Sequence, residues 1–420
     1  KVVLRFDHLD FAYRDGKHVI LSDANFSVRE GTKITIMGQN GAGKSTMFKL
    51  IMWEIKPQAG KVVTDPGARI AIARQTIPRE LLDHTVREYF ETAFEEKDYQ
   101  LDKKAWDALR EVNLTVPLDK KVKELSGGQQ ARLLLAHALI QDPDILLLDE
   151  PTNNLDKAGI GDLIGFLYSY MKTVIVISHD ADFLNLFTDG VLYLNKDRKE
   201  VEQYRGNYYD VVEQIAAQIE KEKKQNARME KKMIDAKEKI NYFSSKWGKM
   251  RKIAKKMRAE IEEAEENVVD VRKDDRTIAP FTIPAPNLVG DIVTVEETTL
   301  MNSNHEVVKV PLKLTARKKE KYLFEGPNGI GKSTLLRKIV TLYTDHYELP
   351  EAGVEVELRE DMLALEGEDG TKLTITPNAR LGYYSQDFDA LDMEMVVWDA
   401  LHEVSNEVTD QEVYRVAGRF

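Results

Sequence analysis

The chain has 420 residues, of which 42% are hydrophobic and 31% charged, and its net charge is −11; this composition is typical of a globular protein long enough to bury two cores. It contains no cysteine, which excludes disulfides, iron–sulfur clusters and cysteine-ligated zinc and fits a reducing cytoplasm. No run approaches 18 uninterrupted apolar residues and no signal-peptide pattern begins the sequence, so we expect no membrane insertion and a cytoplasmic location.

The first motif in chain order has the G-x-x-x-x-G-K-[ST] spacing of a phosphate-binding loop. In such a loop, glycines let backbone N–H groups close around phosphate oxygens, the lysine reaches the β- and γ-phosphates, and the hydroxyl holds Mg²⁺. A strand-like run at 33–37 precedes it, and a helical run at 47–55 follows with its N-terminus toward the phosphates. The candidate ATP-binding residues are Gly38, Asn40, Gly41, Gly43, Lys44, Ser45 and Thr46, with Ser45 also a Mg²⁺ ligand.

The same spacing recurs late in the chain, after a strand-like run at 321–325 and before a helical run at 335–342. A glycine-rich turn that binds nothing would not be expected twice in the same setting. The candidate ATP-binding residues of this second loop are Gly326, Asn328, Gly329, Gly331, Lys332, Ser333 and Thr334, with Ser333 also a Mg²⁺ ligand.

Polar residues between the two loops narrow the range of nucleotide-binding proteins that this chain could resemble. An apolar run at 145–148 ends in Asp149 and Glu150, where the first carboxylate could hold the Mg²⁺ shell and the second could polarise an attacking water. A second buried-strand pattern at 173–178 delivers His179 to the same sheet edge, within reach of a γ-phosphate. Gln75 follows another strand-like run at 69–73.

These motifs together resemble a tandem ATP-binding cassette protein, with Walker A, glutamine loop, LSGGQ signature at 125–129, Walker B, D-loop at 151–156 and switch histidine all matched in the first half. The resemblance implies an α/β fold in which two cassettes of one monomeric chain close head to tail on two ATP molecules. It implies that Tyr13 stacks on adenine, although a lone tyrosine is often ordinary core, and that Gln75 contributes to the Mg²⁺ site. It also implies contact with the opposite ATP by Ser126, Gly127, Gly128 and Gln129.

The connection between the cassettes reads as a helical hairpin. From 208 to 272 there is no proline and one glycine, and apolar residues recur at helical spacing from Val212, Ile215 and Ile219 onward. We expect a second helix at 249–270, folded back at a break near 244–248. Residues 237–258 contain nine basic side chains and one acidic one on an acidic chain, which favours contact with a nucleic-acid backbone, although basic helix faces are often merely solvated. The candidate RNA-binding residues are Lys246, Lys249, Arg251, Lys252, Lys255, Lys256 and Arg258.

Twin cassettes, the helical linker and the sequences at 178–184, 204–208 and 280–284 resemble the ABC-F proteins. This resemblance implies an ATPase that acts on the ribosome as a translation factor, with a linker that contacts tRNA and rRNA near the exit site. An antibiotic-resistance protein of the same family, the ATP-binding subunit of an ABC transporter, and a chromosome ATPase with a coiled coil are the alternatives. The linker turn looks short for a resistance protein, and the hairpin is short for a chromosome ATPase.

The second cassette departs from the pattern. Gln386 is its candidate glutamine-loop residue for ATP and Mg²⁺, but no signature, Walker B or switch histidine follows before Phe420. An insertion is expected at about 343–380, with an added strand near 354–358. We therefore expect nucleotide binding with weak or absent turnover from this chain alone, because it is part of a longer parent or has a degenerate second half. The expected domains are a first cassette at 1–207, the linker at 208–278 and an incomplete second cassette at 279–420.

Overall fold

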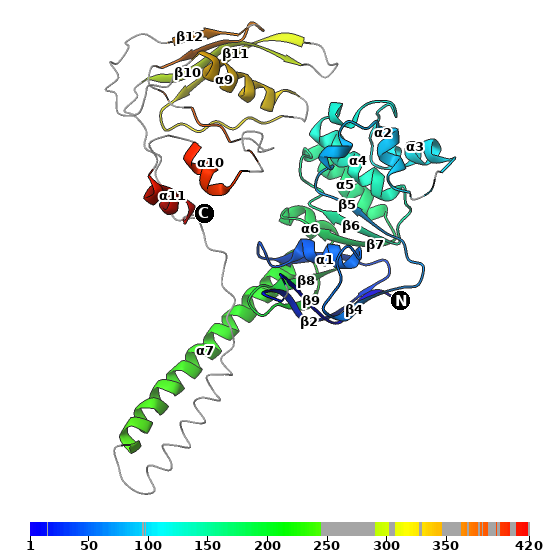
Figure 1. Cartoon of the computed structure of the whole chain (residues 1–420), viewed down its shortest axis with the longest axis vertical. Helices are drawn as coiled ribbons and strands as arrows, with labels where there is room; N and C mark the ends of the chain where they lie inside the picture. The colour runs from blue at the N-terminus through cyan, green and yellow to red at the C-terminus, as the bar shows by residue number, and fades with distance from the viewer. Residues whose placement is uncertain are drawn as a thin grey trace. The chain divides into compact units, whose positions relative to one another are not determined.

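The computed structural model describes residues 1–14, 16–94, 96, 98–244, 290–301, 307–326, 330–346, 363–367, 369–376, 379, 381–384, 392, 395–403 and 409–418. The chain divides into two compact units, Lys1–Asp275 and Arg276–Phe420 (Figure 1). No helix in the described ranges combines the length and the apolar character needed to cross a lipid bilayer.

The first unit contains two sheets. A three-stranded antiparallel sheet has the order β2-β1-β4, and a six-stranded sheet has the order β5-β6-β7-β3-β8-β9. All neighbouring pairs of the larger sheet are parallel except β8 and β9, so β5, β6, β7 and β3 end at one edge. The strands are β1 (Val2–Tyr13), β2 (His18–Arg29), β3 (Lys33–Gly38), β4 (Ala59–Thr64), β5 (Ile70–Ala73), β6 (Ile145–Asp149), β7 (Thr173–Ile177), β8 (Gly190–Asn195) and β9 (Glu200–Arg205).

Alternating apolar residues of the central strands build a core on each face of the larger sheet. Leu146 and Leu148 of β6 pack with the helical layer, whereas Ile145 and Leu147 pack with α1 and the antiparallel sheet. This follows from the two-residue period of a strand whose two faces are both covered. The helices are α1 (Lys44–Ile51), α2 (Val86–Glu91), α3 (Leu101–Glu111), α4 (Gly127–Leu139), α5 (Lys157–Ser169) and α6 (Ala181–Phe187).

Helix α1 ends four residues earlier than the predicted run to 55. Trp53 adopts a left-handed backbone with φ of 55°, and the N–H of Glu54 donates to the Lys49 carbonyl at 2.9 Å. This 6→1 hydrogen bond is the Schellman closure of a helix C-terminus, which satisfies a carbonyl that the helix leaves open.

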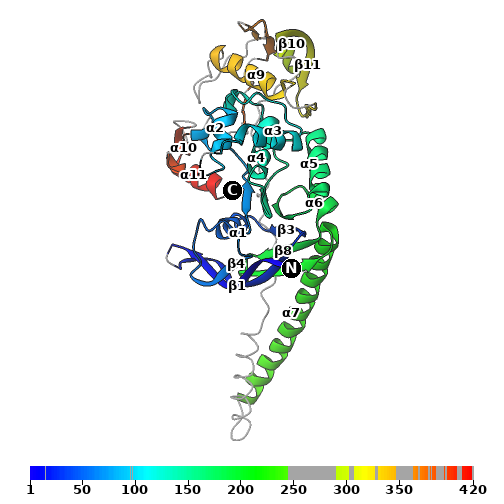
Figure 2. The ribbon, with the colours of Figure 1, turned by 90° about the vertical axis from the view of Figure 1, so that its right-hand side faces the viewer.

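The first linker helix is confirmed as α7 (Tyr208–Ser244), 37 residues in one run, which at 1.5 Å per residue extends about 55 Å. Figure 1 shows it beginning beside the strands β8 and β9 of its own unit, and Figure 2 shows it extending away from them. Its buried stripe begins one residue before the predicted position, because Val211 is fully buried and Val212 is 38% exposed. The second predicted helix and all seven candidate RNA-binding residues lie outside the described residues.

The second unit contains an antiparallel sheet of order β11-β10-β13-β12, on which α9 packs through Leu335, Ile339 and Leu342. The hairpin of β12 and β13 falls inside the insertion expected at 343–380, whereas the strand predicted near 354–358 lies outside the described residues. The elements are β10 (Asp291–Met301), β11 (Val307–Arg317), α9 (Lys332–His346), β12 (Leu363–Glu366), β13 (Lys372–Ile375), α10 (Val397–Glu403) and α11 (Asp410–Ala417).

One strand prediction in this unit is wrong. Residues 321–326 before the second phosphate loop form no strand. The counterpart β3 pairs with β7 on one side and β8 on the other, and neither neighbour has an equivalent among the described residues of the second unit. An extended run without a partner has no ladder hydrogen bonds and is not a strand.

Candidate nucleotide-binding site

The first phosphate loop joins β3 to the N-terminus of α1. Gly43 caps α1 in a left-handed conformation, no side chain in the described part of the chain caps that end, and the first turn carries no acidic residue. The first N–H groups of a helix have no partner within the helix and carry a partial positive charge. The loop therefore has the features of an anion-binding helix terminus.

Two positions of the loop accept only glycine. Gly43 has φ of 104°, and an added Cβ would lie 2.3 Å from Cγ2 of Ile20. A Cβ on Gly38 would lie 2.9 Å from the carbonyl oxygen of Leu194. The close packing of the loop against β2 and β8 explains these glycines independently of any ligand.

An open cleft of about 520 Å³ lies over the loop. Lys44 lies across the loop, and its ammonium donates to the Gly38 carbonyl at 2.8 Å. The Tyr13 hydroxyl is 3.3 Å from Oγ1 of Thr46. The cleft brings together eleven predicted residues, namely Tyr13, Asn40, Gly41, Gly43, Lys44, Ser45, Thr46, Gln75, Asp149, Glu150 and His179.

The sequence reasoning missed other residues that line the same cleft, among them His18, Ile20 and Asn153. His18 is the cross-strand partner of Tyr13 in the pairing of β1 with β2. A period-two reading of each strand with the turn at 14–17 could have indicated that these two side chains share a face. Asn153 belongs to the D-loop that the resemblance had already marked.

The two carboxylates follow from the end of β6. Asp149 pairs with Ile177 across β6 and β7, so it lies at the carboxyl edge of the sheet. Burial raises the pKa of Asp149, and the positive charges of Arg74 and Lys44 oppose that shift. Nearby cations stabilise the anionic form of a carboxylate that has lost hydration. Bound Mg²⁺ would stabilise the anionic form of Asp149 in the same way.

Glu150 is the next residue and has an uncommon backbone, with φ of 51°. Its N–H donates to the Ile177 carbonyl at 2.8 Å, which fixes the turn after β6. Its carboxylate accepts the N–H of His179 at 3.2 Å. Burial raises the pKa of Glu150, and His179 opposes the shift. A carboxylate of raised pKa at a sheet edge is suited to accept a proton.

The signature residues lie at the start of α4 and are not among the described residues that line the cleft. Ser126 caps the helix in a capping box with Gln129: the Gln129 N–H donates to the serine hydroxyl, and the Ser126 N–H donates to the glutamine Oε1 at 3.0 Å. Ser126 and Gly127 are exposed.

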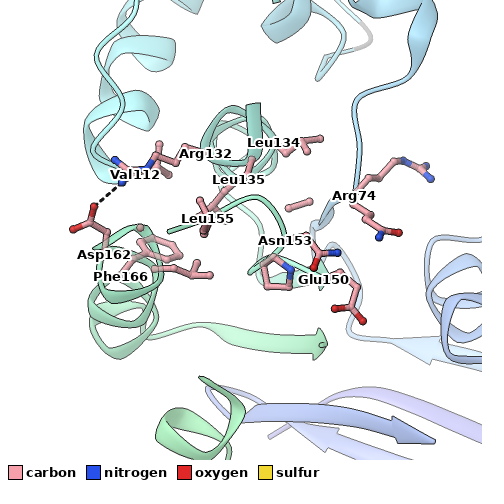
Figure 3. Close-up of a pocket in the computed structure, with 16 residues that line it drawn as sticks. Arg74, Val112, Arg132, Leu134, Leu135, Glu150, Asn153, Leu155, Asp162 and Phe166 are labelled. Atoms are coloured by element: carbon pink, nitrogen blue, oxygen red, sulfur yellow. Dashed lines mark hydrogen bonds and ion pairs between the residues drawn. The ribbon is translucent and has the colours of Figure 1, made fainter. Parts of the chain in front are cut away.

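A small cavity of about 30 Å³ lies between the end of β6 and the helices α4 and α5 (Figure 3). Gln75, Glu150 and Asn153 border both this cavity and the cleft. On the far side, Arg132 of α4 forms an ion pair with Asp162 of α5 at 2.9 Å. The glutamine loop, the Walker B end and the D-loop therefore meet at one point between the sheet and the helices α4 and α5.

The second loop is described in part. Lys332 donates to the Gly326 carbonyl at 2.6 Å, as Lys44 does to Gly38. Gly331 has φ of 98°, close to that of Gly43. Ser333 and Thr334 lie in the first turn of α9. Asn328, Gly329 and Gln386 lie outside the described residues.

The residues of the first cleft fit a magnesium nucleoside triphosphate. The glycine at 43 leaves the helix end uncovered, and a half-buried carboxylate, Asp149, lies within the electrostatic reach of Lys44. Ser45 adds a hydroxyl to the same cleft. Phosphate donors, a cation and hard oxygen ligands are the groups that such a ligand needs.

Comparison with known proteins agrees with this geometry. The sequence model of the family described as "ABC transporter" matches residues 21–153 and 310–419. The Bacillus subtilis protein YdiF is 26% identical over all of this chain and 67% of its own length. The energy-dependent translational throttle protein EttA of Escherichia coli is 30% identical over 91% of this chain and 70% of its own length. An ABC transporter ATP-binding protein of Clostridium tetani is 34% identical over 46% of this chain and 47% of its own length.

The chain thus spans about two thirds of the length of two of these curated relatives and about half of the third. The fold and the cleft are those of an ATP-binding cassette, and the chain belongs to the ABC family and, within it, to the ABC-F proteins.

Proposed function

We propose that this protein is an ATPase of the cytoplasm that acts on the ribosome as a translation factor. The observation that carries the proposal is an assembled first nucleotide site in a chain whose relatives, along nine tenths of its length, include EttA. ATP bound at the interface of the two cassettes would act as a switch, because closure requires both sandwiched nucleotides.

In this proposal the residues of the first cleft have distinct tasks. The loop N–H groups and Lys44 hold the β- and γ-phosphates, and Ser45, Gln75 and Asp149 hold Mg²⁺. Glu150 accepts the proton of the attacking water, and His179 contacts the γ-phosphate. Bound Mg²⁺ supplies charge neutralisation at the phosphates. Lys332, Ser333 and Gln386 have the matching tasks in the second cassette, and Ser126 to Gln129 contact the opposite ATP.

The linker, at 208–278, is proposed to reach tRNA and rRNA near the exit site. Support comes from the charge of residues 237–258, nine basic against one acidic in a chain of net charge −11. A locally basic segment on an acidic protein binds a phosphate backbone without attracting nucleic acid elsewhere. The 37-residue helix α7 carries the chain toward this segment.

The test is sedimentation of the intact protein with purified bacterial ribosomes at physiological salt, with and without ATP. The Glu150→Gln variant keeps ATP bound and should sediment with ribosomes only when ATP is present. Neutralising five linker residues should abolish this co-sedimentation: Lys249, Arg251, Lys252, Lys255 and Lys256.

A matched control removes the same charge from the helical layer of the first cassette, at Lys103, Lys104, Lys120, Lys121 and Lys123. Co-sedimentation should persist in this control, because specific contacts by the linker do not depend on the total charge of the protein. A non-specific attraction, which does depend on total charge, would be weakened equally in both variants. No binding in either nucleotide state would contradict the proposal, and membrane subunits of a transporter would then be the partners to examine.

A further inference from the structure

The end of β8 lies directly beside the first phosphate loop. In the parallel pairing of β3 with β8, Gly38 is opposite Leu194, so the loop and the turn after β8 begin at the same sheet edge. Met37, the residue before the loop, packs in a cluster with Val211 and Ile215 of α7. The first turns of the linker helix therefore rest against the strand that leads into the loop.

The turn between β8 and β9 has a fixed shape. Asn195 is 2% exposed, and its Oδ1 accepts the N–H groups of Asp197 and Arg198 at 3.2 and 3.1 Å. Its Nδ2 donates to Glu202 of β9 at 3.2 Å. An asparagine that accepts two N–H groups ahead of it in the chain imposes one turn conformation. Two of the three basic residues of the turn, Lys196 and Arg198, therefore extend from a backbone of fixed conformation.

Lys196 reaches the phosphate loop. Its ammonium donates to the Asn40 carbonyl at 3.0 Å, and Asn40 lies between the first and second glycines of the motif. A charge-assisted hydrogen bond to a carbonyl is stronger than a neutral one. Lys196 therefore restrains the loop from the side of β8.

Arg198 reaches the linker helix. Its guanidinium lies 3.3 Å from Oε2 of Glu222, and Glu222 is 9% exposed. Gln218, one turn earlier on α7, donates to the other Glu222 oxygen at 3.2 Å and accepts the Tyr204 hydroxyl at 3.1 Å. The ion pair is largely buried and the other carboxylate oxygen is held by Gln218, so the contact is sensitive to the loss of either charged partner.

We propose that Lys196 and Arg198 are positioning residues of the first nucleotide site, which join the phosphate loop to Glu222 of α7, so that nucleoside triphosphate binding and the seating of α7 depend on each other. This inference rests on the proposed function, because it requires ATP to bind at the first loop. It assigns a role to the β8–β9 turn, which is to couple that site to the linker. By linkage, the factor by which seating of α7 raises the affinity for ATP equals the factor by which bound ATP favours the seated helix, so a variant that unseats α7 loses at most that factor in ATP affinity.

The test measures the affinity of the chain for a fluorescent ATP analogue with Mg²⁺. A Lys332→Ala background removes binding at the second loop. Glu222→Gln keeps the shape of the side chain and its hydrogen bond to Gln218 but removes the charge that Arg198 faces. We expect Kd to rise roughly fivefold. Simple electrostatics predicts the opposite sign, because removing a carboxylate favours an anionic ligand.

Two further variants define the contact. Arg198→Met should weaken nucleotide binding in the same way, and Arg198→Lys should restore it by keeping the charge. The matched control is Glu220→Gln, which removes the same charge from the same helix by breaking the exposed Glu220–Lys224 pair of 2.6 Å. It should leave Kd unchanged. A thermal unfolding curve for each variant verifies that it is folded.

Hydrogen exchange gives the reciprocal measurement. Mg-ATP should slow exchange in peptides covering 208–222 of the parent chain and should have no such effect in Glu222→Gln. An unchanged Kd in Glu222→Gln and Arg198→Met, with exchange in α7 indifferent to ATP, would overturn the inference and leave nucleotide binding intact. If the chain without the Glu222 and Arg198 substitutions failed to bind ATP, the proposed function and the inference would both be overturned. ATP binding without ribosome binding would contradict the proposed function alone.

Discussion

His179 and Glu150 meet at the carboxyl ends of β7 and β6, where the imidazole Nε2 lies 3.2 Å from Oε1 of the carboxylate. The backbone N–H of His179 donates to the other oxygen, Oε2. The glutamate side chain is 11% exposed and the histidine side chain 67% exposed. The carboxylate is therefore held in place from the β7 side, while the imidazole faces the opening of the cleft.

This geometry predicts the effect of Glu150→Gln. The amide can still accept the N–H of His179, but it cannot take a proton from water. We expect phosphate release by the intact protein to fall about 100-fold or more, the usual contribution of a general base, while the affinity for ATP is kept. Phosphate release and nucleotide binding are measured on the same preparation, with the exposed Glu80→Gln as control. Unchanged phosphate release would remove Glu150 from this role.

The sequence predicted the first site to a large extent because its residues lie at the ends of short apolar runs. The strands β3, β6 and β7 were expected from those runs, and parallel pairing brings Lys44, Glu150 and His179 to one edge. Motif spacing within each run is local information. A single sequence is sufficient to read it.

Contacts between distant segments could not be predicted in this way. Lys196 and Asn40 meet only because β8 is inserted next to β3, and strand order cannot be read from any one segment. The cross-strand partnership of Tyr13 with His18 depends on register in the same way. The strand expected at 321–325 fails for the same physical reason, since a strand exists only with its neighbours.

A half-buried histidine of α4, His137, predicts a loss of stability in mild acid. His137 packs on Tyr89 at a ring separation of 4.5 Å, and its Nε2 is 3.0 Å from the Thr92 hydroxyl. That hydroxyl donates to the Tyr89 carbonyl, so its oxygen accepts the Nε2–H of His137. Burial lowers its pKa to about 4.

Below a pH of about 6.5 the unfolded chain binds a proton at His137 that the folded chain does not, so folding stability falls as the pH drops toward 4. At pH 5 this amounts to about 2 kcal/mol. His137→Gln should reduce the difference in unfolding free energy between pH 7 and pH 5 by that amount, as measured by urea titration. Equal differences in the variant and the parent would contradict the prediction.

Replacing glycines by alanine should have opposite effects on stability in the phosphate loop and in a regular helix. Gly43→Ala combines a left-handed backbone with a Cβ 2.3 Å from Ile20, so we expect loss of nucleotide binding and a destabilisation of about 1–3 kcal/mol. At Gly41, also left-handed, no described atom lies within 4 Å of an added Cβ, and Gly41→Ala should cost less. Gly165→Ala, on the exposed face of α5, should stabilise by about 0.5–1 kcal/mol. Thermal unfolding checks the order, and a Gly43→Ala variant as stable as Gly41→Ala would refute it.

Tyr13 lies at the rim of the first cleft and offers a ring beside the phosphate loop. Its hydroxyl contact with Thr46 is long, at 3.3 Å, and the ring packs edge-on against Phe11 at 4.9 Å. If the ring stacks on the base, Tyr13→Ala should weaken ATP binding about tenfold or more, whereas Tyr13→Phe, which keeps the ring, should change it little. Both are measured in the Lys332→Ala background. Equal losses in the two variants would assign the contribution to the hydroxyl, and no loss in either would place the base elsewhere in the cleft.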